Sequence, residues 1–566
     1  MRRYLPGILI LMQLCNSSLL HGQDLEHIGS AKPIDFSGAL SLRLNSYSSN
    51  RDNALRDPFF WTITGSPTLS LYGVTLPFYF SFSQKQTDYR QPFNQFGLSP
   101  HYKWLRLHLG YRNISFSDFT LSNHTFRGVG IEAEPSIFRF GFMYGRFLKA
   151  IDQPRDTLSG EIIIPTFARK GIAAKIGVGT QNNYVDLIFF KGKDDSTSVS
   201  SGWGEAGIRP AENLVYGIKA RQAFLKIFTF DLDYGFSVYT SDVTAATVSP
   251  DEYKVPALVT AFLTPRTSTS FLMAGKASLA VRLKMLSLRL QYTRVEPDYQ
   301  SMGSYFLNND YENITIAPAW SMMKNKIRVS GSLGFQRNNI FGDKLNSTNR
   351  RINSVNVTIM PEPRLSITTF YTNYRINQER NIRLSMDTLR LEQFSDNLNV
   401  MANLMRGTKQ IRHNFTAGVN YQVLRDDSNI SETNNNTTSM NPSLGYRYQN
   451  MVNHFGANVN ITLNQFNTDV SETMRMGYTI GANKSVLDDD LRFNASATYF
   501  TVNTDGSAQS NALSINARIG YSIKEKHSLD LSTSIVSRKL AASEDPAMRD
   551  VLANFGYTYN FGRNSR

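Results

Sequence analysis

The chain has 566 residues, with 60 Lys and Arg against 46 Asp and Glu, so its formal net charge is +14. Hydrophobic residues make up 41% and charged residues 19%, both below the roughly 45–50% and 25% of an average soluble protein. No stretch approaches the roughly 20 apolar residues of a membrane-spanning helix. The 36 Phe and 27 Tyr exclude a disordered chain, because such chains are poor in aromatic residues.

The beginning of the chain has the pattern of a secretory signal peptide. Two arginines precede an apolar core over residues 7–14, and Gly22 is a small residue at a plausible cleavage point. We therefore expect a signal peptide over residues 1–22 and a short periplasmic segment over residues 23–35. The single cysteine, Cys15, falls inside the expected signal peptide. A lipoprotein site there is the alternative, which the bulky preceding leucine disfavours.

Along the rest of the chain, hydrophobic residues recur at every second position. The alternation is clearest over residues 105–112, 138–144, 228–238, 455–464 and 551–561. A period of two is typical of β-strands with one apolar face, and no comparable stretch repeats apolar residues at helical spacing. The sequence therefore predicts an all-β fold.

Short turns alternate with long polar connections between the expected strands. Tight turns are expected around residues 73–74, 103, 134–135, 284–285, 324–325, 361–363, 450–451 and 524–525. Long connections are expected at residues 48–58, 84–94, 114–126, 148–168, 193–212, 241–266, 297–311, 338–350, 378–389, 425–437 and 539–548. This alternation is typical of outer-membrane barrels, with short periplasmic turns and long extracellular loops. We expect a single closed antiparallel transmembrane β-barrel of about 22–26 strands over residues 36–562, followed by a tail over residues 563–566.

The strand face opposite the apolar face would line the lumen of such a barrel. In the N-terminal half this face carries ten basic residues: Arg106, His108, Arg112, Arg139, Lys175, Lys219, Arg221, Arg282, Arg289 and Arg328. In the C-terminal half it carries mostly Asn, Ser, Thr and Gly, with Arg447, Arg475, Arg492 and Arg518 as scattered exceptions. A basic wall would attract anions. The alternative is that these side chains pair with carboxylates on neighbouring strands and only stabilise the barrel.

The connection that follows residue 295 is rich in aromatic and turn residues. Its distinctive residues are Pro297, Tyr299, Gly303, Tyr305, Phe306 and Asp310. This composition favours an ordered loop folded into or over the barrel mouth, which would constrict the pore. An ordinary surface loop is the alternative.

The sequence contains no motif of a known enzyme class. It has no Gly-x-Ser-x-Gly elbow, no His-Glu-x-x-His, no cysteine cluster and no phosphate-binding glycine loop. Among the scattered histidines, His124 beside Ser122 and Asn123 is the one local grouping of interest. We expect no enzymatic activity, no cofactor and no metal. Because the basic residues alternate with apolar positions and form no basic stripe, we also expect no nucleic-acid partner.

Two stretches resemble segments of large outer-membrane β-barrels of Bacteroidota. One is RVEPDYQSMG at residues 294–303, followed by Asn-Asn-Asp at residues 308–310, and the other is LNSTNRRINS at residues 345–354. The strands rich in Asn, Ser, Thr and aromatic residues are similar in style to that family. The resemblance implies residence in the bacterial outer membrane. The expected first strand follows the signal peptide too closely for the plug domain of a TonB-dependent transporter.

These observations favour a porin-like channel or transporter for small polar or anionic solutes. The alternative is a non-conducting barrel subunit of an envelope secretion, lipid-transfer or assembly complex. The expected partners are outer-membrane lipids and lipopolysaccharide, and the barrel-assembly machinery during biogenesis. If the alternative holds, lipoproteins or other envelope subunits would be partners as well.

Overall fold

The computed structural model describes residues 34–562 except for residues 52–55, 85–94, 153–164, 201–206, 252–253, 381–390 and 429–435. The expected signal peptide and C-terminal tail lie outside the described residues. The first strand begins at Ile34, slightly before the expected residue 36.

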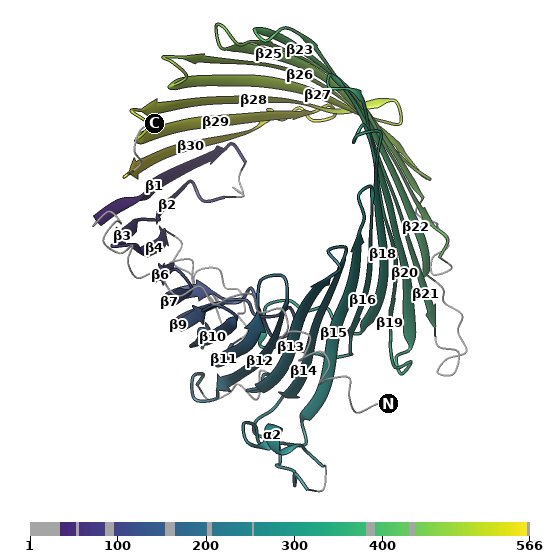
Figure 1. The fold of residues 1–566 in the computed structure, drawn as a ribbon. Helices are drawn as coiled ribbons and strands as arrows, with labels where there is room; N and C mark the ends of the chain where they lie inside the picture. Colours follow the sequence, from purple (N-terminus) through teal and green to yellow (C-terminus); the bar gives the residue numbers. More distant parts are fainter. Residues whose placement is uncertain are drawn as a thin grey trace.

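Twenty-eight β-segments form one antiparallel sheet that curves into a ring (Figure 1). The first and last strands are β1 (Ile34–Ser49) and β30 (Met548–Phe561). Between them, the uninterrupted strands are β4 (Val74–Ser83), β7 (Leu105–Asn113), β9 (Thr125–Ala133), β10 (Phe138–Leu148), β11 (Ala168–Gly179), β12 (Tyr184–Asp195), β13 (Glu212–Phe224), β14 (Phe228–Thr240), β15 (Thr269–Arg282), β16 (Leu286–Val295), β18 (Tyr311–Met322), β19 (Ile327–Asn338), β20 (Asn346–Glu362), β21 (Leu365–Arg380), β22 (Leu391–Gly407), β23 (Ile411–Asp426), β24 (Thr437–Asn450), β25 (Phe455–Thr468), β26 (Glu472–Val486), β27 (Leu491–Thr504), β28 (Ser507–Ile523) and β29 (His527–Leu540).

Two further spans are each divided into two short strands. One consists of β2 (Phe59–Gly65) and β3 (Thr68–Leu71), and the other of β5 (Gln95–Leu98) and β6 (His101–Tyr102). Each break contains a proline, Pro67 or Pro100, and proline has no N–H to donate to a strand ladder. Counting each divided pair as one, the described sheet has 26 spans. The predicted all-β barrel is confirmed, at the upper end of the expected strand number.

The sheet closes because the first strand pairs with the last. Gly38 lies opposite Phe561 and Ser49 lies opposite Asp550, with every position between them in register. Closure leaves no unpaired strand edge, which a hydrocarbon environment requires. Gly38 permits this geometry with a φ of +145°, and a Cβ there would lie 2.6 Å from the Ser66 carbonyl oxygen.

The connections are short at one end of the ring and generally long at the other. Both ends of the sheet lie at the short-turn end, where Lys324 and Asn325 adopt φ of 56° and 68° in a tight hairpin. Such positive φ values match the twist of the flanking strands. At the other end, residues 469–471 and 505–506 form short connections that the alternation did not predict. We assign the short-turn end to the periplasm, as in outer-membrane barrels.

The longest described connection, residues 241–268, folds against the outside of the ring. It contains α2 (Ala257–Thr260), and Val259 is buried against Leu214 and Val238 on the outer face (Figure 1). Among the described residues, no helix is both long and apolar enough to cross a membrane. Elsewhere the outer face exposes large apolar side chains, including Ile176, Leu187, Leu444 and Ile480.

Candidate functional site

Two connections from the long-loop end fold back inside the ring of strands (Figure 1). The first inner segment, residues 114–124, joins β7 to β9 and contains β8 (Leu121–Ser122). The second inner segment, residues 296–310, joins β16 to β18 and contains β17 (Gly303–Ser304). β8 and β17 pair in parallel, so the two segments hold each other although they lie far apart in the chain.

The first inner segment covers an apolar patch on the inward face of the wall. Phe116 and Leu121 belong to a buried cluster with inward side chains of β9 to β13. The full cluster is Ile114, Phe116, Leu121, Phe126, Met143, Phe147, Ala173, Ile188, Phe190, Ala211, Val215 and Met302. The inner face of a water-filled barrel is polar. This part of the inner face is apolar, and the first inner segment shields it from water. Each fully buried Phe or Leu contributes about 1.5–3 kcal/mol.

Inward glycines leave room for the inner segments. A Cβ on Gly141 would lie 2.7 Å from the Phe116 ring, and one on Gly217 would lie 2.6 Å from Thr120 Cγ2. A Cβ on Gly235 would lie 2.4 Å from the Tyr299 hydroxyl oxygen. These distances are far below van der Waals contact, so even alanine would push the segments from the wall. The wall and the inner segments are therefore fitted to each other.

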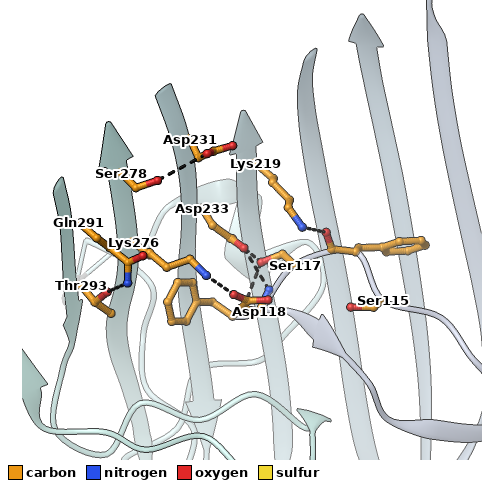
Figure 2. A network of polar contacts seen from close by, with 12 residues as sticks. Ser115, Ser117, Asp118, Lys219, Asp231, Asp233, Lys276, Ser278, Gln291 and Thr293 are labelled. Atoms are coloured by element: carbon orange, nitrogen blue, oxygen red, sulfur yellow. Dashed lines mark hydrogen bonds and ion pairs between the residues drawn. The ribbon is translucent and has the colours of Figure 1, made fainter. Parts of the chain in front are cut away.

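Asp233 of β14 is the centre of the polar attachment (Figure 2). One of its carboxylate oxygens accepts from Ser117 Oγ at 2.5 Å, and the other accepts from the backbone N–H of Asp118 at 3.1 Å. Asp118 in turn forms an ion pair with Lys276 of β15. Asp233 is buried, so its charge is compensated by donors from the first inner segment. The wall thus holds this segment by both polar and apolar contacts.

Asn213 of β13 attaches the second inner segment. Its Oδ1 accepts from the backbone N–H of Met302 at 3.0 Å, and its Nδ2 donates to Ser237 Oγ at 2.8 Å. Ser237 Oγ donates onward to the carbonyl of Gln300 at 2.7 Å. Asn213 is fully buried. Moving the segment would leave these buried polar groups without partners, at a cost in free energy, so the hydrogen bonds hold the segment in one position.

The structure divides the six predicted constriction residues into two groups. Four of them, Pro297, Tyr299, Gly303 and Asp310, are buried. Tyr299 donates from its hydroxyl to the Phe119 carbonyl at 2.7 Å, which links the two inner segments. The other two, Tyr305 and Phe306, are 41% and 94% exposed. The buried group positions the segment and the exposed group is accessible to solvent.

The imidazole ring of His124, at the end of the first inner segment, packs between Tyr305 of the second inner segment and Phe147 of the wall. It stacks on Tyr305 with 3.8 Å between ring centroids and meets Phe147 edge-on at 4.7 Å. Its Nδ1 lies 2.9 Å from the carbonyl oxygen of Thr125. Burial, together with the nearby charge of Arg169, lowers the pKa of His124 to about 4. The ring is therefore neutral near pH 7. Among the described residues, no three His, Cys, Asp or Glu side chains could hold a metal ion.

All ten predicted basic residues occupy inward positions of the wall, and four of them have carboxylate partners. The contacts are His108 to Glu132 at 2.9 Å, Arg139 to Asp186 at 2.7 Å, Arg221 to Asp231 at 2.5 Å and Lys175 to Glu134 at 3.8 Å. These side chains fit the interpretation in which charges on nearby strands compensate each other.

The other six basic residues form no close ion pair among the described residues, although Lys219 lies directly opposite Asp186 and Asp233, and Arg106 lies directly opposite Glu132. Lys219 donates to the carbonyl of Phe116 at 3.2 Å, and the buried Nε of Arg112 has no hydrogen-bond partner there. The remaining four are exposed: Arg106, Arg282, Arg289 and Arg328. The last three lie on β15, β16 and β19, toward the short-turn end. We call these four the free arginines.

The opposite wall, formed by β22 to β30, is mostly uncharged and polar, with Arg447, Arg475 and Arg492 as scattered basic positions. Asn441 donates to Asn420 at 3.3 Å, and Asn420 donates to Asn397 at 3.1 Å, which forms an amide ladder across three strands. Thr479 and Thr498 form a further uncharged polar contact across this wall, with their hydroxyl oxygens 3.0 Å apart. Within the described part of the chain, no hydrogen bond joins either inner segment to this wall. The sequence had indicated the polar wall but not the inner segment over residues 114–124.

No protein-family model and no curated protein matches the sequence. Similar solved structures include OpdK from Pseudomonas aeruginosa, at 8% identity, covering 62% of this chain and 94% of that one, with a TM-score of 0.30. The FrpB iron transporter from Neisseria meningitidis is 10% identical over 94% of this chain and 84% of that one, with a TM-score of 0.38. OccAB2 from Acinetobacter baumannii is 12% identical over 67% and 98%, with a TM-score of 0.27.

These likenesses are distant, and the class rests on the geometry of this chain. A closed antiparallel ring, short turns at one end and an apolar outer face together define an outer-membrane-type β-barrel.

Proposed function

We propose that the protein is an outer-membrane channel for small polar or anionic solutes, narrowed from one side by the two inner segments. The asymmetry of the lumen carries the proposal. The inner segments attach to β9 to β15, whereas no hydrogen bond between described residues joins them to the amide and hydroxyl side chains of β22 to β30. Barrels of 16–18 strands already enclose an aqueous channel, so 26 spans leave space beside two short segments.

The free arginines support a preference for anions. Their charges are exposed and form no close ion pair with described carboxylates, and only Arg106 has a carboxylate, Glu132, directly opposite it. They therefore raise the local concentration of anions in the lumen. Arg139 and Arg221 contribute little to such a preference, because Asp186 and Asp231 compensate them. Selectivity is therefore assigned to only part of the basic wall.

Single-channel recording in planar bilayers tests this proposal. In a salt gradient, the wild-type barrel should show an anion-selective reversal potential. Changing the four free arginines together to Gln should shift the reversal potential toward that of a less anion-selective channel, while conductance persists. The control is the charge-neutral double variant Arg221→Gln with Asp231→Asn, which should keep the wild-type potential. A folded, heat-modifiable barrel that never conducts would reject the channel.

A second candidate function, a subunit of an envelope complex, is favoured by apolar residues at the short-turn end. Leu225, Met323, Val452 and Leu487 are each more than 60% exposed at or beside turn tips. These four residues lie on four separate turns around that end of the ring, so a partner would contact several turns at once. Under this alternative the barrel would be silent in bilayers and would co-purify with envelope proteins in mild detergent.

A further inference from the structure

Strands β9 to β12 lie side by side in the wall of the ring (Figure 1). Four basic residues form a row across them. Arg146 of β10 lies directly opposite Arg127 of β9 and also opposite Lys170 of β11. Lys170 in turn lies directly opposite Lys193 of β12. We call these four residues the outer cationic row.

The outer cationic row points away from the lumen. Phe126 and Phe147, which are sequence neighbours of the two arginines, belong to the buried inner cluster. Gly171 and Gly192, which are neighbours of the two lysines, face Phe147 and Met302 of that same cluster. Because successive side chains in a strand point to opposite faces, the four cations lie on the outer face.

The row marks the extracellular boundary of the apolar outer band. One position pair closer to the short-turn end, the outer face carries Val129, Tyr144 and Ile172 on β9, β10 and β11. Val129 and Tyr144 are 48% and 51% exposed on this outer face. In an outer-membrane barrel such a band meets the hydrocarbon. The cations just beyond it lie at the depth of the outer-leaflet headgroups.

The chain compensates this row only in part. Like charges placed directly opposite each other on neighbouring strands are destabilising. Lys170 Nζ lies 3.8 Å from a carboxylate oxygen of Asp195, and Arg127 lies over the ring of Tyr111 at 5.7 Å. Both contacts are exposed or long, so they screen the row weakly.

Arg146 and Lys193 have no ion pair among the described residues. The carboxylate opposite Lys193 belongs to Glu212, but Glu212 is buried and pairs with Lys191 at 3.1 Å. No described carboxylate remains for the centre of the row. An anion from outside the chain would remove the repulsion between these side chains.

We propose that the outer cationic row binds phosphate groups of lipopolysaccharide in the outer leaflet. Guanidinium groups bind phosphate through two parallel hydrogen bonds, and ammonium groups act as compact point charges. Basic clusters at a membrane surface recognise anionic headgroups in this way. With neighbouring strands about 4.8 Å apart, the row is wide enough to contact more than one phosphate.

Native mass spectrometry of the full chain in neutral detergent tests the proposal. The barrel is incubated with bisphosphorylated lipid A, dephosphorylated lipid A or phosphatidylglycerol, and the lipid that remains bound is counted. The row variant is R127Q/R146Q/K170Q/K193Q. The matched control, K226Q/K324Q/K409Q/K524Q, removes the same charge from the short-turn end. Heat-modifiability on gels verifies that each variant is folded, and R146Q/K193Q replaces the row variant if that variant does not fold.

The wild type and the control should retain bisphosphorylated lipid A equally. The row variant should bind it about tenfold more weakly or worse, because each basic residue near an anionic surface adds affinity. Equal retention of dephosphorylated lipid A would overturn the proposal, as would an equal loss in the control. Equally tight binding of phosphatidylglycerol would also overturn it, since the row would then be a general anionic-lipid surface.

Discussion

At the scale of single residues, the partner across the sheet decides what a charge on the inner wall does. Arg139 and Asp186 are not on adjacent strands, and they meet because Gly177 lies between them on β11. A Cβ on Gly177 would lie 1.9 Å from the Asp186 carboxylate. Arg289 has Ala280 and Ala317 beside it instead. One arginine is therefore neutralised and the other is free.

His124 predicts a pH dependence for docking of the first inner segment. An undocked His has a pKa near 6.5, whereas burial lowers the pKa of the docked ring to about 4. Above pH 6.5 the ring is neutral in both states and docking has its full strength. As pH falls from 6.5 to 4, only the undocked form takes up a proton, so docking weakens by about 1.4 kcal/mol per pH unit.

Hydrogen exchange of residues 114–124 at pH 7.5 and pH 4.5, corrected for intrinsic rates, measures this effect. Protection should fall at the lower pH in the wild type, and the fall should be absent in His124→Gln. Because stacking on Tyr305 differs in the variant, the comparison concerns the change with pH and not the absolute protection. Identical pH profiles for both proteins would contradict the prediction.

At the scale of elements, the inner segments explain why several strands are apolar on both faces. Residues 187–190 of β12 read Leu-Ile-Phe-Phe, with Leu187 exposed outward and Ile188 and Phe190 buried inward. A strand between lipid and water would alternate apolar with polar residues. This strand lies between lipid and a folded segment, so both of its faces are apolar. The unbroken apolar run was thus a local signal for the inner segments.

Gly235→Ala should loosen the second inner segment while leaving the barrel closed. The added Cβ would overlap the Tyr299 hydroxyl, and such overpacking costs about 1–3 kcal/mol. We expect faster exchange over residues 296–310 and a larger single-channel conductance. Gly520→Ala is the control, because its Cβ would meet only Asp530 at 3.8 Å. Equal exchange and conductance in the two variants would show that the segment does not depend on this contact.

At the scale of the whole molecule, closure joins residues more than 500 positions apart. Ser41 of β1 and Thr558 of β30 lie directly opposite each other with their hydroxyls 2.9 Å apart. The ring therefore depends on one seam between the first and last strands. An open sheet would expose unpaired backbone groups to lipid, each at a cost of several kcal/mol.

Cysteines introduced at the seam should form a disulfide bond. In a Cys15→Ser background, Ser41→Cys with Thr558→Cys should cross-link on mild oxidation and alter mobility on a denaturing gel, since opposite residues lie within disulfide range. Ser41→Cys with Ser532→Cys should not, because Ser532 belongs to β29, which does not pair with β1. Cross-linking of the second pair alone would contradict the closure seen here.

Most of the architecture could be predicted because its cause is local. Each span needs one face for lipid, so a period of two marks strands wherever they occur, as in residues 455–464. The predicted turns at residues 73–74, 324–325 and 524–525 coincide with hairpins. The short connections at residues 469–471 and 505–506, at the long-loop end, were missed because turn chemistry alone does not tell one end of the barrel from the other.

The candidate site was less predictable, because its contacts join distant parts of the chain. The aromatic richness of residues 296–310 indicated an ordered segment. Nothing near residue 118 indicated that Asp118 would meet Asp233 and Lys276. Those contacts require the five strands before β14, and the six before β15, to be in register. The role of the free arginines in selectivity stays a prediction.

The sequence by itself determined the strands, their apolar faces and the closed barrel. The alternation of apolar and polar residues is a local property of the sequence. The closed barrel follows because hydrocarbon permits a sheet only when every backbone group is paired. Only the tertiary structure decided which connections fold inward, which basic residues have partners and where cations gather on the outer face. Those properties follow from cross-strand register and from contacts such as Tyr299 with Phe119, which exist only once the ring has closed.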